Sequence, residues 1–486
     1  MDGLSILLCI TLLSIPLIFM LNRHGGRKNL PPGPPALLFI AKCLMLKGPI
    51  YQLGPILRSL HARYGPIVSV CLGRTFVFVA DRHLAYSALV KGGGNFDSRP
   101  QPSEIFTLFL GGSMSASPLG DYFRLVRRNL HSQALHPSRV RLFAPARKRV
   151  CDALAASLRL DAASHPQGIV TPRPLLARSL FDLLMYMTFG VWIGREALDE
   201  MQKMQLQISE AISRFPVLSI FQGITKRLQR KQWASDVALR ERQKELMLPL
   251  IRTPRAGGPP CYADSLLELR VAEDGGRPLT DDEMVSLCSE FMIASLDTSV
   301  TLLEWIMAEI VNHPDVQAKL YEEVRGKPEL GDDDLREMPY LKAVVLEGLR
   351  LRPTGHLVFP HGVQSDTELG GFMVPKGTDI NFLVADFGLD DTVWTAAREF
   401  RPERFMENHD VDITGTKEIK MVPFGAGRRM CPGYALAILH AQFFVGSLVR
   451  EFQWLPPAQG TLDMTEELAM TIIMKHPLRA RIIPRA

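Results

Sequence analysis

The pattern of apolar and polar positions predicts a mainly α fold with small β-sheets. Most segments repeat apolar residues at helical spacing and end at proline, glycine or a capping residue. Two β-rich runs, 67–72 and 75–80, are separated by Gly73 and Arg74, which predicts a hairpin. Shorter β-rich runs are expected at 358–363, 371–374 and 379–383.

One predicted helix is much longer than the others. Thr280 and Glu283 form a capping box at its start, and the pair His313-Pro314 ends it. Such a helix would be about 45 to 50 Å long and could carry side chains past a buried cofactor. A second apolar helix is expected over 434–449.

The N-terminus predicts a membrane anchor. Residues 4–21 are mostly apolar and would span about 27 Å as a helix. Asp2 precedes this run and Arg23, Arg27 and Lys28 follow it, which is the wrong order for a cleaved signal peptide. We therefore expect residues 1–22 to be a single-pass anchor in the endoplasmic reticulum, with the rest of the chain in the cytosol.

A basic and proline-rich hinge, 23–36, is expected to separate this anchor from the body. Its run of prolines, 31–35 with one glycine, cannot continue a helix and is stiff and extended. Taken alone, the same run could be a ligand for an SH3-type domain. Neither repeats nor a low-complexity linker divide residues 37–486, so we expect one catalytic domain.

Composition narrows the class of protein. The chain has 486 residues, 47% of them hydrophobic and 22% charged, so it can bury a large core. Its seven cysteines show no zinc-finger spacing and no disulfide framework. The net charge of +5 is modest and no basic run is interleaved with aromatic residues, so we expect no nucleic-acid partner.

The most informative stretch is FGAGRRMCPG, residues 424–433. Its glycines allow close approach of a flat group to Cys431, and its arginines should lower the pKa of the thiol. The N-terminus of the following helix would add positive potential. A dinucleotide-binding loop is excluded because the third glycine is replaced by Met430. Both a nucleophile and a metal ligand remain open for Cys431 on these grounds alone.

The spacing of Phe424, Gly427, Arg429, Cys431 and Gly433 resembles the haem-binding loop of the cytochrome P-450 family. The resemblance implies a cytochrome P-450 fold that binds haem b, with the thiolate of Cys431 as axial ligand of the iron. A thiolate ligand favours cleavage of the O–O bond of dioxygen. The implied chemistry is oxygen activation.

The long helix contains a second part of the resemblance. Ala294, Asp297 and Thr298 resemble the family's oxygen-binding signature, with Asp297 and Thr298 as the catalytic pair for proton delivery. The alternative is an ordinary Asp-Thr pair in which Thr298 bonds back to a helix carbonyl. The family usually has glycine where this chain has Ser295, which changes the space expected over the haem.

Glu347, Arg350 and Arg404 resemble a buried ion network of the family. Glu347 and Arg350 lie on one helix face, and Arg404 comes from the sequence FRPERF. Taken alone, the first two could be an ordinary surface ion pair. The resemblance implies a structural role beneath the cysteine loop.

The two haem propionates should meet several cationic or donor groups. The candidates implied by the resemblance are Arg99, Arg127, His361 and Arg429. The family has tryptophan where this chain has Phe123, so one donor is missing, and Tyr122 is the proposed replacement.

Electrons must come from a partner, since the sequence contains no flavin or nicotinamide fingerprint. The resemblance implies an NADPH-dependent flavoprotein reductase. A basic cluster could face its acidic surface or could simply be a solvated helix face. The cluster comprises Arg124, Arg127, Arg128, Arg139 and Arg141.

Several phrases of the sequence resemble plant microsomal members of the family. The chain is therefore expected to be a monooxygenase that inserts one atom of dioxygen into a small apolar molecule such as a secondary metabolite, lipid or xenobiotic. The expected pocket residues are Ile105, Phe106, Phe109, Leu110, Phe291, Thr354, His356, Leu357 and Ile472. Two alternatives are a haem-thiolate isomerase or dehydratase that rearranges hydroperoxides, and a haem-binding member without turnover.

Overall fold

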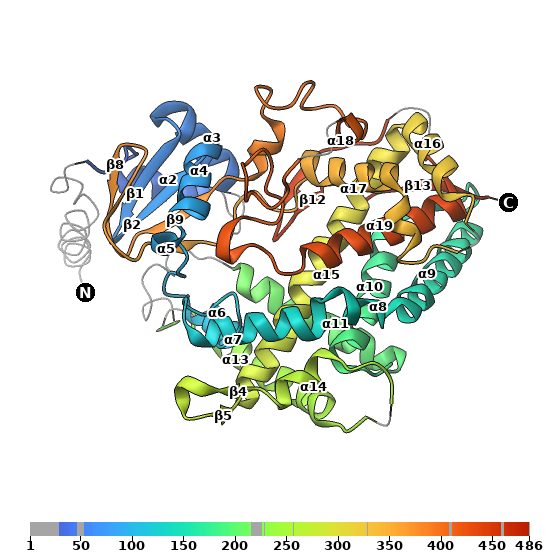
Figure 1. Cartoon of the computed structure of the whole chain (residues 1–486), viewed down its shortest axis with the longest axis horizontal. Coiled ribbons are helices and arrows are strands. Elements are labelled where there is room, and N and C mark those ends of the chain that lie inside the picture. The colour runs from blue at the N-terminus through green and yellow to red at the C-terminus, as the bar shows by residue number, and fades with distance from the viewer. Residues whose placement is uncertain are drawn as a thin grey trace, which may run out of the picture.

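The computed structural model describes residues 29–45, 53–214, 226–227, 229–255, 257–327, 329–407, 411–457 and 461–485. The proposed anchor, 1–22, and residues 23–28 of the hinge lie outside these residues. Figure 1 shows β1, β2, β8 and β9 gathered with α2 to α5 at one side of the molecule, with the long helices and the other labelled strands in the rest. The expectation of a mainly helical fold with small sheets is confirmed.

The helices of the larger part surround α15 (Figure 1). The longer ones are α7 (Asp121–Leu130), α9 (Ala144–Ser164), α10 (Pro172–Phe189), α11 (Arg195–Ser213), α13 (Arg230–Arg252), α15 (Asp281–Asn312), α16 (Pro314–Val324), α17 (Pro339–Leu351) and α19 (Tyr434–Glu451). The shorter ones are α2 (Ala36–Met45), α3 (Leu53–Tyr64), α4 (Arg82–Tyr86), η2 (Ser87–Lys91), α5 (Gly93–Phe96), α6 (Glu104–Leu110), η3 (His131–Leu135), α8 (Pro137–Arg141), α14 (Tyr262–Leu267), η5 (Ala272–Asp274), η6 (Asp334–Glu337), η7 (Ala385–Leu389), α18 (Arg404–Glu407) and η8 (Gly427–Arg429).

The main sheet has the order β1-β2-β9-β6. The predicted hairpin is confirmed: β1 (Ile67–Leu72) and β2 (Arg74–Val79) pair antiparallel around Gly73, which has φ 75°. β9 (Asp379–Phe382) then adds to β2 in parallel. The run expected at 358–363 contributes only β6 (His361–Gly362). Pro360 has no N–H to offer to a ladder, which accounts for the shorter strand.

The remaining sheets are smaller. β10 (Phe452–Leu455), β13 (Ala480–Pro484) and β3 (Ile169–Val170) form one sheet in that order. Three antiparallel pairs complete the set: β11 (Glu466–Leu468) with β12 (Ile472–Met474), β4 (Arg270–Val271) with β5 (Arg277–Pro278), and β7 (Thr367–Leu369) with β8 (Phe372–Val374). The run expected at 371–374 is therefore one half of a hairpin whose other half was not predicted.

Helix α15 has the predicted ends. The hydroxyl of Thr280 accepts from the Glu283 N–H, and the Glu283 carboxylate accepts from the Thr280 N–H, so the capping box is confirmed. Among the described helices, α15 is the one long and apolar enough to cross a membrane, and 72% of its most apolar window is buried inside the protein. It packs against α10, α13, α17 and α19 and is therefore the central core helix.

Candidate active site

The loop that carries Cys431 is held by short-range backbone bonds. The Cys431 N–H donates to the Phe424 carbonyl at 2.8 Å, and Gly425 and Gly427 have φ 70° and 72°. A Cβ on Gly427 would lie 2.0 Å from the carbonyl oxygen of Leu89 in η2. Gly427 is thus required by close packing against η2, and not only by the approach of a cofactor.

The expected low pKa of the Cys431 thiol is wrong for the chain by itself. Burial raises the pKa of Cys431, while the Gly433 N–H and the charge of Arg127 oppose the increase without overcoming it. Cys431 is nevertheless exposed as a residue, so the chain does not cover it completely. A coordinated thiol is deprotonated by the metal, which would supply the stabilisation that the arginines do not.

Three arginines converge around this loop. Arg127 Nη2 donates to the Met430 carbonyl at 2.8 Å, directly before Cys431. Arg429 donates through Nε to the Asp97 carbonyl at 2.7 Å and through Nη2 to the Ser117 carbonyl at 2.8 Å. Arg99 donates to the carbonyls of Ser115, Phe359 and Pro360 at 3.1, 3.1 and 2.8 Å. We call Arg99, Arg127 and Arg429 the carbonyl-bound arginines.

The charges of the carbonyl-bound arginines are not neutralised by direct contact. Within the described residues, none of the three forms an ion pair. Burial and the nearby charge of Arg429 lower the pKa of Arg99 to about 9. Burial lowers the pKa of Arg429 to about 10, with Arg127 adding to the effect. Mutual repulsion among desolvated cations makes this region a favourable place for an anionic group.

The residue at the family's tryptophan position lies between two of these cations. The guanidinium of Arg429 lies 3.8 Å from the ring centre of Phe123, and that of Arg127 lies 5.8 Å from it. Phe123 therefore orients both arginines by cation–π contact although it has no N–H. The suggested role of Tyr122 is not supported, because its hydroxyl donates to the Gly112 carbonyl at 2.6 Å.

His361 is buried and its position differs from the expectation of a propionate donor. Its Nδ1 lies 2.6 Å from the Phe96 carbonyl oxygen, and burial lowers the pKa of the ring to about 3. A neutral ring that donates from Nδ1 to a carbonyl has no proton on Nε2. His361 therefore supports the segment around Phe96 and, while neutral, offers an acceptor and not a donor.

Three exposed apolar side chains would suit a flat apolar cofactor with an anionic edge. Ala294 is exposed in the middle of the buried helix α15, and Tyr434 is 36% exposed at the start of α19. Phe359 is 55% exposed although Arg99 lies 5.8 Å from its ring centre. An exposed cysteine, exposed apolar groups and adjacent cations match the iron, the ring and the propionates of haem.

The carboxylate of Asp297 is held by groups other than Thr298. Asp297 accepts from Thr471 Oγ1 at 2.7 Å and forms an ion pair of 3.4 Å with Arg173 of α10. Thr298 Oγ1 donates to the Ala294 carbonyl at 2.7 Å, which is the ordinary helical arrangement considered above. Arg173 and Thr471 were not predicted, because they lie more than 120 residues from Asp297 in the sequence.

Glu347, Arg350 and Arg404 meet in the interior. Arg350 Nε and Arg404 Nε lie 2.7 and 3.0 Å from the Glu347 carboxylate, and the three side chains are 0%, 0% and 7% exposed. Arg350 also donates to the Gly388 and Ala397 carbonyls, and Arg404 to that of Thr395. We call these three residues the Glu347 network.

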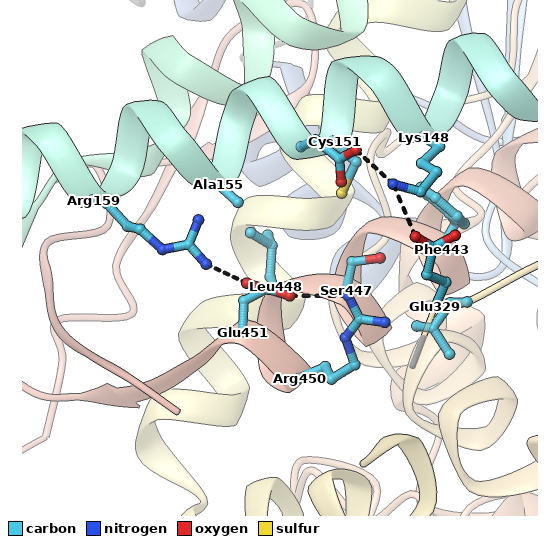
Figure 2. A pocket seen from close by; sticks show the side chains of 12 residues that line it. Lys148, Cys151, Ala155, Arg159, Glu329, Phe443, Ser447, Leu448, Arg450 and Glu451 are labelled. Carbon is cyan, nitrogen blue, oxygen red and sulfur yellow. Dashed lines mark hydrogen bonds and ion pairs between the residues drawn. The ribbon is translucent and has the colours of Figure 1, made fainter. Parts of the chain in front are cut away.

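A surface recess of about 360 Å³ lies between α9 and α19 and is drawn in Figure 2. Its charged residues neutralise one another: Lys148 pairs with Asp152 and Glu329, and Arg159 pairs with Glu451. Neither Cys431 nor Asp297 lines it. We therefore do not assign the substrate to this recess.

Three of the expected pocket residues have contacts with other segments of the chain. His356 Nδ1 is 3.3 Å from Arg58, and its ring packs beside Gly54 of α3. Phe109 is fully buried, and its carbonyl accepts from Arg240 of α13. Ile472 is buried in β12, where its carbonyl accepts from Trp305 Nε1 of α15 at 2.7 Å, so this strand does lie against the central helix.

Comparison with known proteins agrees with this geometry. The sequence model of the cytochrome P450 family matches residues 31–483. Cytochrome P450 89A9 of Arabidopsis thaliana is 38% identical over 97% of this chain and 96% of its own length. Isoflavone 3'-hydroxylase of Medicago truncatula is 31% identical over 93% of this chain and 92% of its own.

A further relative has a different named reaction. Phenylacetaldehyde oxime monooxygenase of Prunus mume is 30% identical over 96% of this chain and 92% of its own length. The family match covers nearly the whole described body, including Cys431, the carbonyl-bound arginines and the Glu347 network. The chain therefore belongs to the cytochrome P450 family of haem-thiolate monooxygenases.

Proposed function

We propose that the protein inserts one oxygen atom from dioxygen into a small apolar plant secondary metabolite, with electrons from NADPH delivered by a flavoprotein reductase. The observation that carries the proposal is the exposed Cys431 beside three arginines that have no carboxylate partner among the described residues. Two relatives are named for hydroxylase and monooxygenase activity, which supports the reaction class.

In this proposal Cys431 would supply the thiolate ligand, and Arg99, Arg127 and Arg429 would bind the haem propionates. Haem with a thiolate ligand supplies the activation of dioxygen when it is bound. Phe123 keeps the guanidinium groups of Arg127 and Arg429 in place. Ala294, which has no bulky side chain, leaves room above the haem on the face of α15.

Proton delivery is assigned to Asp297 and Thr298. The Asp297 carboxylate is half-buried and contacts Arg173, whose side chain is 21% exposed, so it can exchange protons with solvent through this side. Rotation of Asp297 away from Arg173 would bring a proton to the hydroxyl of Thr298, which lies in the next position of α15.

The partner surface is assigned to the exposed part of the basic cluster. Arg127 is excluded from it because its guanidinium is bonded at Met430. Arg124 pairs with Asp121 and Arg141 with Asp333, so these two already have acidic neighbours. Arg128 is exposed and Arg139 donates to Gln133, so an acidic reductase surface would meet these two first. The proposed location is the endoplasmic reticulum membrane, through residues 1–22.

The deciding experiment is the CO difference spectrum of the reduced protein. The strongly red-shifted Soret band of a thiolate-ligated haem is expected, and a band without this shift would contradict the role of Cys431. Turnover is then measured on the same sample with reductase and NADPH across a panel of apolar plant metabolites. Conversion of fatty-acid hydroperoxides without NADPH would instead support the rearranging isomerase or dehydratase.

A further inference from the structure

The segment between α6 and α7 is held from two opposite directions. We call residues 111–117, Gly-Gly-Ser-Met-Ser-Ala-Ser, the serine loop. On one side its carbonyls accept from the carbonyl-bound arginines: Ser115 from Arg99 at 3.1 Å, and Ser117 from Arg429 at 2.8 Å. The serine loop therefore lies next to the groups assigned to the haem edge.

On the other side the serine loop is bound by one carboxylate of the central helix. Glu290 of α15 accepts from the Met114 N–H through Oε2 at 2.9 Å and from the Ser115 N–H through Oε1 at 2.7 Å. Glu290 is one helical turn before Ala294, so the two residues lie on the same face of α15. The carboxylate thus connects the serine loop to the helix face that is assigned to oxygen binding.

The contact requires a carboxylate. Both oxygens of Glu290 accept from backbone N–H groups. In a glutamine at the same place, the side-chain N–H₂ group would face one of these backbone N–H groups, and two donors cannot form a hydrogen bond with each other. Burial raises the pKa of Glu290, while the Ser115, Met114 and Ser113 donors oppose this increase. Its charge also opposes the lowering of the pKa values of Arg99 and Arg429, although it pairs with neither of them.

The rest of the segment is fixed independently of Glu290. At the end of α6, the Phe109 carbonyl accepts from Arg240 of α13. On the α7 side, the Tyr122 hydroxyl donates to the Gly112 carbonyl at 2.6 Å. The backbone N–H groups of Met114 and Ser115, at the middle of the serine loop, depend on Glu290 alone among the described residues.

We propose that Glu290 is a positioning residue that fixes the serine loop as a wall of the substrate pocket and so limits the size of the molecules that reach the haem. This inference rests on the proposed function, because it takes the face of α15 around Ala294 as the oxygen-binding side. Loss of the carboxylate would allow the middle of the serine loop to move outward.

The test compares Glu290→Gln with Glu273→Gln in the full chain with haem bound. Glu273 is a matched control, since it accepts from a backbone N–H, that of Tyr122, at 3.0 Å but does not contact the serine loop. Amide hydrogen exchange at Met114 and Ser115 is expected to be about tenfold faster in Glu290→Gln. Each of these two N–H groups loses its hydrogen bond to a charged carboxylate, or the good alignment of that bond. Exchange in Glu273→Gln should match the wild type at these two positions.

A second readout separates positioning from general stability. Spectroscopic titration with imidazole and with the larger 1-phenylimidazole measures access to the iron. In Glu290→Gln, the ratio of the two affinities is expected to change by about threefold or more in favour of the larger ligand, with imidazole itself unchanged. Unchanged exchange, or an equal change for both ligands, would overturn the proposal.

The two proposals fail in different ways. If the wild type lacks the thiolate spectrum with CO, the proposed function fails, and the exchange data still report whether Glu290 holds the serine loop. If the spectrum is present and exchange at Met114 and Ser115 is unaltered, only the positioning role fails. Should Glu290→Gln not fold, Glu290→Asp, which keeps the charge but shortens the reach, has the same expected results.

Discussion

The protein buries arginines in two clusters that differ in what compensates their charge. In the Glu347 network, Arg350 and Arg404 both contact the Glu347 carboxylate, and carbonyls of the chain satisfy their other donors. The carbonyl-bound arginines have carbonyl partners as well, but no ion pair among the described residues. The first cluster has an acid in direct contact with its arginines, whereas the second has only the more distant charges of Asp97 and Glu290.

This difference distinguishes a structural use of buried charge from a binding use. A buried cation is costly unless it is paired and hydrogen-bonded. In the Glu347 network the chain itself supplies the compensation, so the network can form before any cofactor binds. Around Arg99 and Arg429 the nearby charges of Asp97 and Glu290 oppose the effect of burial, but neither acid pairs directly with these arginines and their pKa values stay lowered. Binding of a dicarboxylate cofactor would relieve this unfavourable charge.

The most drastic change is Cys431→Ser, which tests whether the second cluster serves a thiolate-ligated haem at all. We expect complete loss of the red-shifted CO band and of NADPH-dependent turnover, because a serine hydroxyl does not replace the thiolate. Visible spectra of the reduced protein provide the measurement. Cys71→Ser is the control, since Cys71 lies in β1 with its sulfur 3.8 Å from Thr75 Oγ1. A normal CO spectrum from Cys431→Ser would mean that another group ligates the iron.

The next largest effect is expected from Glu347→Gln, which removes the acid of the first cluster. Both arginines then keep a buried charge without a counter-ion, and the free energy of unfolding should fall by about 3 to 5 kcal/mol. The loss should be the same with and without haem, measured by chemical denaturation. Glu245→Gln, at an exposed pair with Arg242, is the comparison and should change stability by less than about 1 kcal/mol.

A smaller effect that depends on the cofactor is expected from Arg429→Met. The substitution keeps an apolar stem over Phe123 but removes the cation, so haem should be released about tenfold more readily. Stability should decrease more in the haem-bound protein than in the apoprotein, whereas Arg404→Met should affect both equally. The readouts are the rate of haem transfer to an acceptor protein and denaturation of both forms. Equal effects of the two substitutions would remove the distinction between the clusters.

The smallest effect concerns Asp379, a buried carboxylate whose charge is only partly compensated by a neighbouring arginine. Its partner Arg74 is 2.8 Å away but 42% exposed, and burial raises the pKa of Asp379 from 3.8 to about 6. Between these two pH values the folded protein binds more protons than the unfolded chain. The contribution of Asp379 to the free energy of unfolding is therefore fully present below pH 4 and is lost as the pH rises through 6.

Asp379→Asn should therefore flatten the pH dependence of unfolding. Relative to wild type, the variant is expected to gain about 1 to 3 kcal/mol between pH 4 and pH 7. Denaturation curves at several pH values measure this difference. Parallel curves for variant and wild type would show that Arg74 compensates Asp379 fully, as Glu347 compensates its arginines.

Local sequence patterns predicted much of the fold. The capping box placed the start of α15, the Gly73-Arg74 turn placed the β1-β2 hairpin, and the spacing around Cys431 identified the family. These features depend on neighbours within a few residues, so the order of residues is enough to predict them. The unpredicted strand β7 pairs across Gly370 and Gly371, a turn that the β-rich pattern alone did not reveal.

The chemical state of the site could not be predicted in the same way. The sequence suggested a low pKa for Cys431 from its adjacent arginines, but burial by distant segments raises it. It suggested His361 as a donor, but the carbonyl of Phe96, 265 residues away, takes the Nδ1 proton. Desolvation and long-range hydrogen bonds depend on which distant segments pack together, and local sequence patterns do not show this.

By itself, the sequence determined which groups are present and their local geometry: a cysteine in a glycine loop, an Asp-Thr pair in a long helix, and enough arginines for two clusters. Only the tertiary structure decided which arginines meet an acid and which do not, that Arg173 and Thr471 hold Asp297, and that Glu290 holds the serine loop. The physical reason is that helix and turn patterns arise from neighbouring residues. The compensation of a buried charge arises from segments that meet only when the chain has packed.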